Sequence, residues 1–265
     1  MLEKKMTYIF SSDPANGAEN ISEDGSEFFV QLYDPISVPH AARYCTIEVQ
    51  AANIWNTTPN ISVALDNNTF AFFDGTVDQV ITIPNGLYDL GQLAQAINVQ
   101  IDNIPATIPS DELFIFTGDQ STQRVLITFK SAGLSIDWPQ STLRKILGFR
   151  TTSPPSVGID QTLIGEDIAR FNVINSFLIH TDLIHSGIPV NAVDTAVIAN
   201  VFIDVTPGSL INYTPFNIPV SNANELIGAK RSRLKFYLTD QSNVRVDTNN
   251  EYWSFTMVVR YYVRE

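Results

Sequence analysis

A twelve-residue segment near the end of the chain carries the feature that most restricts its fold. From position 252 to position 263, apolar side chains occupy every second place. One face of such a segment carries Trp253, Phe255, Met257, Val259, Tyr261 and Val263, and the other carries Tyr252, Ser254, Thr256, Val258, Arg260 and Tyr262. This period of two predicts a β-strand whose first face lies in a core, where its burial would contribute on the order of 10 kcal/mol before entropy is subtracted. The second face is mixed, and predicts that the insertion described below or a neighbouring chain partly covers it.

Short apolar runs separated by turn residues extend this β pattern over most of the chain. Eight strands are predicted, at residues 28–33, 44–51, 61–64, 69–73, 176–184, 196–205, 234–238 and 252–263. Asp34-Pro35 and Val38-Pro39 predict a connection, because proline has no N–H to donate within a central ladder. Eight strands with Greek-key-like connections would form a single jelly roll, and an immunoglobulin-like sandwich fits the count nearly as well.

The middle of the chain differs in kind. A strand is predicted at Val80–Ile83, followed by a helix whose apolar residues Leu90, Leu93, Ala94, Ile97 and Ile101 have helical spacing and whose start Asp89 is suited to cap. Strands follow at 113–116 and 125–129. A short helix then starts near Pro139, has Leu143, Ile146 and Leu147 on its apolar face, and ends at Gly148. This mixed α+β order predicts an inserted subdomain at residues 77–165, closed by the linker-like segment 151–156.

The start of the chain is polar up to about residue 26. It contains Asp13-Pro14-Ala15-Asn16-Gly17 and an acidic, Gly- and Ser-containing stretch before Phe28. This composition predicts a flexible N-terminal arm at residues 1–26. The expected division is therefore an arm, a jelly-roll domain at residues 27–76 and 166–265, and the insertion between them.

Charge limits the classes of partner. With 28 acidic and 16 basic residues the net charge is −12, so we expect no direct contact with nucleic acid. No segment approaches the roughly 18 apolar residues needed to span a membrane, and the N-terminus lacks the apolar stretch of a signal peptide, so an intracellularly made chain is expected. The single cysteine, Cys45, lies in an apolar run, which favours a buried thiol over a reactive one.

The residues with catalytic potential form no motif. His180 and His185 are five positions apart, which on a strand places them on opposite faces and makes them a poor pair of metal ligands. Phosphate-binding glycine loops, zinc-protease motifs and nucleophile elbows are missing from the sequence. Glu23-Asp24 and Glu166-Asp167 are interpreted as solvated loop charges, and Asp247–Glu251 as a hairpin turn into the last strand rather than a Ca²⁺ loop. We therefore expect no enzyme, and predict no catalytic, cofactor-binding or metal-binding residues.

Several local phrases together resemble the minor capsid (penton) proteins of small icosahedral double-stranded DNA viruses, such as virophages and Polinton-like viruses. The phrases are Ile83-Pro84-Asn85-Gly86-Leu87-Tyr88 with the helix through Leu93 and Ile97, Leu147-Gly148-Phe149, Asn175-Ser176-Phe177-Leu178-Ile179, Pro207-Gly208-Ser209-Leu210-Ile211, Leu238-Thr239-Asp240-Gln241 and Trp253-Ser254-Phe255. The resemblance covers most of the chain after Phe28. It implies a single jelly roll that forms homopentamers at the vertices of the virion capsid and contacts the major capsid protein, with the insertion displayed outward and the arm reaching under a neighbouring capsid protein.

Two other functions are compatible with the residues. A virion spike or lectin-like receptor-binding module would use exposed aromatic residues such as Phe70, Phe72 or Trp138 for recognition, although core packing is the more common use of such residues. A carbohydrate-active jelly-roll enzyme would need two carboxylates facing one cleft. A vertex spike or a host receptor, contacted through the insertion, is a further expected partner.

Overall fold

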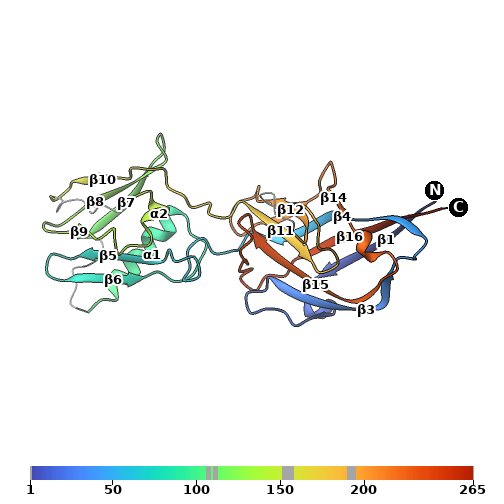
Figure 1. Ribbon diagram of the computed structural model, residues 1–265. Helices are drawn as coiled ribbons and strands as arrows, with labels where there is room; N and C mark the ends of the chain where they lie inside the picture. Colours follow the sequence, from blue (N-terminus) through green and yellow to red (C-terminus); the bar gives the residue numbers. More distant parts are fainter. Residues whose placement is uncertain (1, 106–108, 110–112, 151–157, 190–194, 265) are drawn as a thin grey trace. The chain divides into compact units, whose positions relative to one another are not determined.

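The computed structural model describes residues 2–105, 109, 113–150, 158–189 and 195–264 (Figure 1). The chain forms two compact units. The first, called unit 1 below, consists of Met1–Thr58 and Ile174–Glu265, and the second, unit 2, of Pro59–Val173. Both are built mainly from β-strands, as the short apolar runs predict. The predicted borders at residues 77 and 165 thus differ from those of the compact units.

Unit 1 contains two five-stranded sheets. The first has the order β1-β16-β4-β13, with β14 also paired to β4, and is formed by β1 (Leu2–Ser11), β4 (Ala42–Trp55), β13 (Leu210–Tyr213), β14 (Val220–Asn222) and β16 (Ser254–Val263). The second has the order β12-β11-β15-β3-β2, formed by β2 (Ala18–Glu19), β3 (Glu27–Ser37), β11 (Ser176–Thr181), β12 (Val197–Phe202) and β15 (Lys230–Asp240). Every named pair in both sheets is antiparallel.

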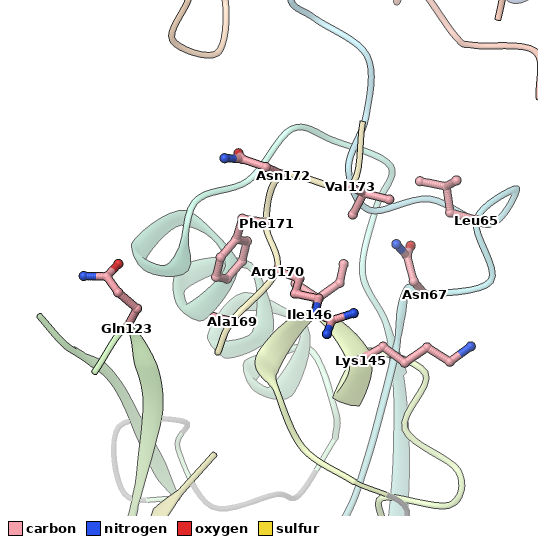
Figure 2. Close-up of a pocket in the computed structure, with 10 residues that line it drawn as sticks. All are labelled: Leu65, Asn67, Gln123, Lys145, Ile146, Ala169, Arg170, Phe171, Asn172 and Val173. Atoms are coloured by element: carbon pink, nitrogen blue, oxygen red, sulfur yellow. The ribbon is translucent and has the colours of Figure 1, made fainter. Parts of the chain in front are cut away.

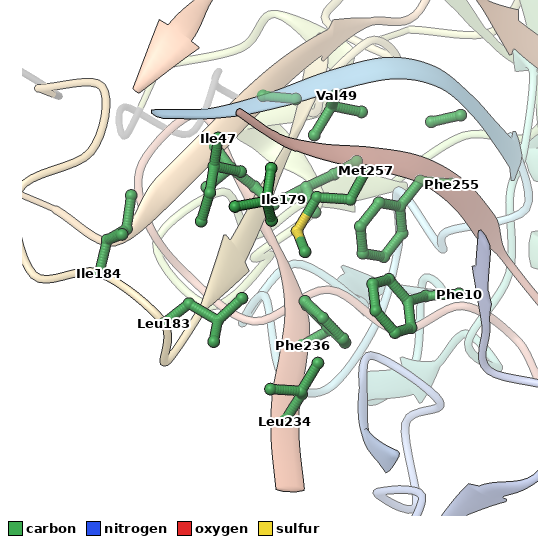
Figure 3. Packing of buried hydrophobic residues seen from close by; sticks show 14 of the residues in the cluster. Phe10, Ile47, Val49, Ile179, Leu183, Ile184, Leu234, Phe236, Phe255 and Met257 are labelled. Atoms are coloured by element: carbon green, nitrogen blue, oxygen red, sulfur yellow. The ribbon is translucent and has the colours of Figure 1, made fainter. Parts of the chain in front are cut away.

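Side chains from both sheets form one hydrophobic core in unit 1 (Figure 3). Phe255 on β16 lies with its ring centroid 5.0 Å from that of Phe236 on β15, and Phe10 on β1 lies 4.5 Å from Phe236. Trp253 packs edge-on against Phe28 at 5.0 Å and donates its indole N–H to the carbonyl oxygen of Gly25. The face of the last strand that the sequence predicts to be buried is therefore the centre of the sandwich.

The N-terminal arm is where the structure departs most from the sequence-based prediction. Residues 2–11 are not a loose arm, because they form β1 and pair antiparallel with the whole of β16, from Leu2 opposite Val263 to Ser11 opposite Ser254. Met6, Tyr8 and Phe10 pack on the core side of this strand. They alternate with Lys5, Thr7 and Ile9, so a period of two was present but was masked by the polar residues that surround it.

The predicted connection at Asp34-Pro35 lies inside a strand. β3 runs from Glu27 to Ser37, and its pairing to β15 shifts register between Arg231 and Arg233. Arg233 is opposite Gln31 and Arg231 is opposite Ile36, so Pro35 falls in the bulge between the two paired stretches. A proline is tolerated there because no ladder hydrogen bond requires its missing N–H.

The described residues of unit 2 form two three-stranded sheets and two α-helices. One sheet has the order β10-β8-β7 and the other β6-β5-β9. Its elements are β5 (Thr69–Phe73), β6 (Asp78–Thr82), α1 (Leu90–Asp102), β7 (Phe114–Asp119), β8 (Arg124–Phe129), β9 (Ser135–Ile136), α2 (Arg144–Leu147) and β10 (Thr162–Ile164). The predicted strand at 69–73 is thus β5, which pairs with β6 and β9 of this unit, and Ile61 forms only an isolated bridge to Gly86. Neither segment is a strand of the sandwich, which corrects the predicted set of eight.

The predicted helices both form, but the second begins at Arg144 and not near Pro139. α1 begins with a full capping box, in which the Asp89 carboxylate accepts from the backbone N–H of Gln92 and the Gln92 side chain accepts from the N–H of Asp89. Its residues Leu93, Ile97 and Ile101 are buried, as their spacing predicts. α2 is only one turn long and ends at Gly148, whose φ of 79° is left-handed. A Cβ at that position would also lie 2.3 Å from the carbonyl oxygen of Asp167, so only glycine fits. The linker-like segment 151–156 lies outside the described residues.

Candidate functional site

His180 and His185 make separate contacts and do not form a site together. His180 lies in β11, where its ring is buried and its Nε2 lies 2.8 Å from the Thr239 hydroxyl, so its partner is a side chain and not the backbone. His185 lies beyond the end of β11, and its Nε2 is 3.8 Å from the Glu225 carboxylate. Among the residues that the structure describes, no group of three or more His, Cys, Asp or Glu side chains is placed to hold a metal ion.

The acidic pairs and the acidic turn are occupied by local contacts. Burial raises the pKa of Asp24, but hydrogen bonds from Ser22 and Ser26 outweigh it and lower the pKa overall. The carboxylate of Asp167 pairs with Arg150 at 3.3 Å. Asp247–Glu251 is a turn with left-handed Asn249 and Asn250, as predicted, but it joins β15 of one sheet to β16 of the other and is therefore not a hairpin.

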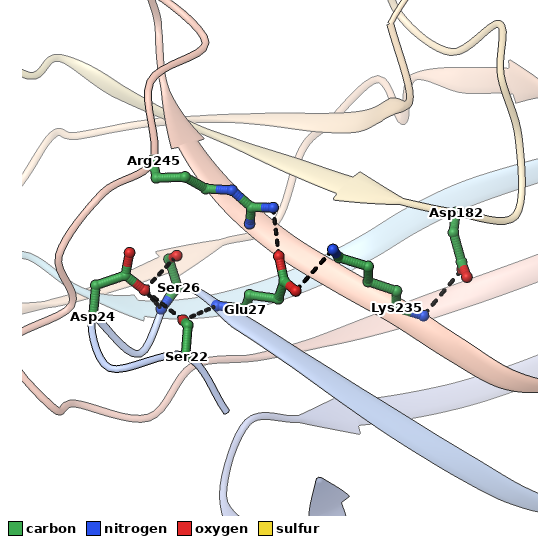
Figure 4. A network of polar contacts seen from close by, with 7 residues as sticks. All are labelled: Ser22, Asp24, Ser26, Glu27, Asp182, Lys235 and Arg245. Atoms are coloured by element: carbon green, nitrogen blue, oxygen red, sulfur yellow. Dashed lines mark hydrogen bonds and ion pairs between the residues drawn. The ribbon is translucent and has the colours of Figure 1, made fainter. Parts of the chain in front are cut away.

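The outer face of the β3–β15–β11 sheet carries a ladder of stacked rings and cations. The Tyr237 ring has the His180 ring stacked on it at 4.4 Å, and the Arg245 guanidinium 3.6 Å from its centroid. The Glu27 carboxylate accepts from Arg245 at 2.5 Å and from Lys235 at 2.7 Å (Figure 4). Burial, and then the charge of Arg245, lower the pKa of His180 to about 4, so its imidazole is neutral near pH 7.

The strand β15 carries a cluster of basic residues, Lys230, Arg231, Arg233 and Lys235, which are four of the chain's 16 cations. Arg233 and Lys235 alternate with the buried Leu234 and Phe236 and so share the face of Tyr237, whereas the adjacent Lys230 and Arg231 point to opposite sides of the strand. Arg233 lies over the Phe29 ring at 4.8 Å. Arg233, Lys235 and Arg245 outnumber the two carboxylates that contact this group, Glu27 and Asp182, in a chain whose net charge is −12.

The outer face of the β1–β16–β4 sheet has a different chemistry. Arg260 on β16 donates to Glu48 on β4 at 2.8 Å and to Glu3 on β1 at 2.6 Å, so one guanidinium joins three strands. Tyr262 lies opposite Tyr44, with ring centroids 6.3 Å apart. The charges in this ladder nearly balance, and the tyrosines make the face partly apolar.

Two aromatic side chains of unit 1 are fully exposed. Tyr33 on β3 has its whole surface in contact with solvent, and Phe216, between β13 and β14, has 99%. In contrast Phe70, Phe72 and Trp138, the aromatic residues suggested as a recognition surface, are at most 1% exposed and belong to the core of unit 2. That suggestion is wrong, because Phe70, Phe72 and Trp138 belong to the same buried cluster as the apolar residues of α1 and α2.

Unit 2 has a pocket of about 770 Å³ (Figure 2). Two cationic side chains line it, Lys145 from α2 and Arg170 from the segment that follows β10. The other lining residues are amides or apolar, namely Leu65, Asn67, Gln123, Ile146, Ala169, Phe171, Asn172 and Val173. The sequence did not point to Lys145 and Arg170, because they are 25 positions apart and belong to no motif.

Comparisons with known proteins bear on the fold. No protein-family model and no curated protein matches the sequence. The crystal structure of the mavirus penton protein aligns with a TM-score of 0.52 and 11% sequence identity, over 98% of this chain and all of that one. A chain in the cryo-EM structure of the Sputnik virophage aligns with a TM-score of 0.48 and 13% identity, over 96% of this chain and 97% of that one. The alignment with the mavirus penton protein shows that the chain has the fold of that protein. A separate finding is that no helix among the described residues is long and apolar enough to cross a membrane.

Proposed function

We propose that the chain is a structural vertex (penton) protein of an icosahedral virion, in which unit 1 is a single jelly roll that assembles into homopentamers and contacts the major capsid protein. The observation that carries the proposal is the full-length match of fold to the mavirus penton protein, which includes both units. The proposed location is the virion capsid, after synthesis inside the host cell. A structural role also fits the local contacts that the side chains of His180, Asp167 and Asp24 make.

The two outer sheet faces of unit 1 support assembly into a ring. A closed ring with cyclic symmetry joins two different surfaces of neighbouring subunits, so each subunit needs two faces of unlike chemistry. One face here is cationic with stacked rings, and the other is nearly neutral with paired tyrosines. The rings of Tyr33 and Phe216 are exposed to solvent in the single chain. Burial of these rings against a neighbouring subunit would stabilise the assembly.

Mass photometry and size-exclusion chromatography with light scattering test this function. We expect a pentamer at high concentration, or on addition of the cognate major capsid protein. Tyr33→Ser and Phe216→Ser should reduce that association while the melting temperature stays within about 2 °C of the parent, because neither side chain is buried. A chain that stays monomeric under both conditions contradicts the proposal.

A receptor-binding role for unit 2 is the second candidate, and one observation favours it. All the residues that line the pocket with Lys145 and Arg170 belong to unit 2. A vertex protein with such a unit would combine capsid closure with ligand recognition.

A further inference from the structure

The pocket of unit 2 contains positive charge that the protein itself does not neutralise. Neither the Lys145 ammonium nor the Arg170 guanidinium has an ion pair within 4.0 Å among the described residues, and no carboxylate lines the pocket. The pKa of Asp167 is lowered first by its hydrogen bond to Arg150, and the charge of Arg170 is a smaller cause of the same shift. Unit 2 holds twelve acidic and six basic residues, so two unpaired cations in one hollow are not what its composition predicts.

Hydrogen bonds fix the backbone around the pocket, and the backbone in turn positions the cationic residues. The N–H of Arg170 donates to the carbonyl oxygen of Ile146 at 2.7 Å, which ties the 169–173 segment to α2. The N–H of Ala169 donates to the carbonyl oxygen of Gln123. The carbonyl oxygen of Phe171 accepts from the Asn60 side chain at 3.0 Å. Because three successive residues, 169 to 171, make these hydrogen bonds, Arg170 and Phe171 are preorganised for a ligand.

The aromatic and amide residues of the pocket lining are suited to bind a ligand ring that carries hydroxyl groups. Figure 2 shows Phe171 between Gln123 on one side and the two cations on the other. The half-buried Phe171 ring also lines an adjoining hollow of about 210 Å³, so it presents an apolar surface next to amide groups. Gln123 and the exposed Asn172 offer both donors and acceptors. The volume lies within the range of sites for small molecules.

We propose that this pocket binds an acidic sugar, with the carboxylate held by Arg170 and Lys145 and the sugar ring lying against Phe171. A guanidinium suits a planar carboxylate because it donates two parallel hydrogen bonds, and Lys145 adds a second charge. The proposal concerns unit 2 only. Failure of sugar binding would leave pentamer formation untouched, and a strictly monomeric chain would leave sugar binding untouched.

Titration of the full-length protein tests the proposal, by saturation-transfer NMR and calorimetry with N-acetylneuraminic acid and with glucuronic acid. Galactose serves as the neutral control and inorganic phosphate as the simple-anion control. We expect saturable binding of at least one acidic sugar, and none of galactose. Absence of saturable binding of both acidic sugars overturns the proposal, and so does phosphate binding as tight as the sugar, which would indicate a site for any anion.

Variants locate the site. Arg170→Ala and Lys145→Ala should each weaken the sugar at least about tenfold, and Arg170→Lys should weaken it less than Arg170→Ala. The matched control is Lys130→Ala, which removes a cation of the same unit that pairs with Asp160 and does not line the pocket. All four side-chain changes are at exposed or half-exposed positions, and thermal melting checks that the fold is kept. Equal affinity in the Arg170 and Lys130 variants would place binding elsewhere and overturn the proposal.

Discussion

Arg260 on β16 donates its Nε hydrogen to Glu48 on the neighbouring strand β4, at 2.8 Å, although the residue directly opposite Arg260 is Thr46. The pair is therefore diagonal across the ladder. The Glu48 side chain is only 10% exposed, whereas Glu3, the other partner of Arg260, is 44% exposed. Hydrogen bonds to Glu48 and then to Glu3 raise the pKa of Arg260. One guanidinium thus compensates a nearly buried carboxylate on the outer face of the sheet.

Removal of Arg260 should cost far more stability than removal of its exposed partner. Arg260→Ala leaves Glu48 without its countercharge, and we expect a loss of about 2 kcal/mol in the free energy of unfolding. Glu3→Gln should cost less than about 0.5 kcal/mol, because exposed ion pairs are screened by solvent. Urea denaturation of both variants measures the difference. Equal losses in the two variants would show that Glu48 does not depend on Arg260.

The two faces of the last strand should respond differently to substitution. Phe255 packs against Phe10, Phe236 and Trp253, so Phe255→Ala should destabilise unit 1 by about 3 to 5 kcal/mol. Tyr262 is half-buried on the outer face, where its ring is tilted by 31° against the Tyr44 ring, so Tyr262→Ser should keep the monomer folded and weaken self-association. Thermal melting and mass photometry separate these outcomes. Loss of folding in Tyr262→Ser would assign its face to the core.

Asn60 should be essential for unit 2. Its side chain donates to the carbonyl oxygens of Tyr88 and Phe171 and accepts from the N–H of Tyr88, and it is 4% exposed. Asn60→Ala removes all three hydrogen bonds and leaves buried backbone groups unpaired, so we expect a loss of about 3 kcal/mol. Hydrogen exchange of amides in residues 59–173 would show faster opening. Asn85→Ala is the control, since Asn85 accepts a single exposed hydrogen bond from Val63.

Burial of neutral His180 should make the protein lose stability in acid. The pKa of His180 is lowered to about 4, below the ordinary 6.5, because burial and then Arg245 disfavour the charged ring. The unfolded chain therefore binds the additional proton between pH 6.5 and pH 4, and the stability that this group contributes is complete above pH 6.5 and falls as the pH is lowered through that window. The expected loss at pH 4.5 is about 2 to 3 kcal/mol.

A variant isolates this group. His180→Phe keeps an aromatic ring next to Tyr237 but cannot bind the proton, so its stability should vary with pH less steeply between pH 6.5 and pH 4. His185→Asn, at an exposed position, should leave the slope unchanged. Chemical denaturation at a series of pH values measures both. The same slope in His180→Phe and the parent would contradict the assignment.

Cys45 should be unreactive until the protein unfolds. It lies in β4 with no exposed surface, and burial raises the pKa of its thiol to about 11. A thiol reagent such as DTNB should therefore give no signal with the native protein at pH 8, and one equivalent in denaturant. Rapid reaction of the native protein would show that β4 opens locally.

The local patterns of the sequence were sufficient to predict the fold class and many of the helices and strands. A period of two in residues 252–263 and a helical period from Leu90 to Ile101 correctly predicted β16 and α1, because a core on one side of an element imposes its own repeat on the sequence. The sequence also predicted the capping residue Asp89 and the helix end at Gly148, since helix ends depend on residues only three or four positions away.

The pairing of strands that are far apart in the sequence could not be predicted from local patterns. The strand β1 looked like a loose arm because its partner, β16, lies about 250 positions away, and the partner decides whether a half-polar segment is a strand or a tail. The same holds for Pro35, which a bulge opposite β15 accommodates, and for β5, whose pairing with β6 and β9 places it in unit 2.

The candidate sites depend still more on tertiary structure. The sequence by itself determined that the chain is mainly β, acidic overall and without a catalytic motif. Only the fold brought Lys145 next to Arg170 in a pocket, stacked His180 on Tyr237, and buried Phe70, Phe72 and Trp138. The physical reason is that side-chain periodicity records which face of one element is buried, whereas a site is made by residues of several elements whose spacing in sequence carries no information about their distance in space.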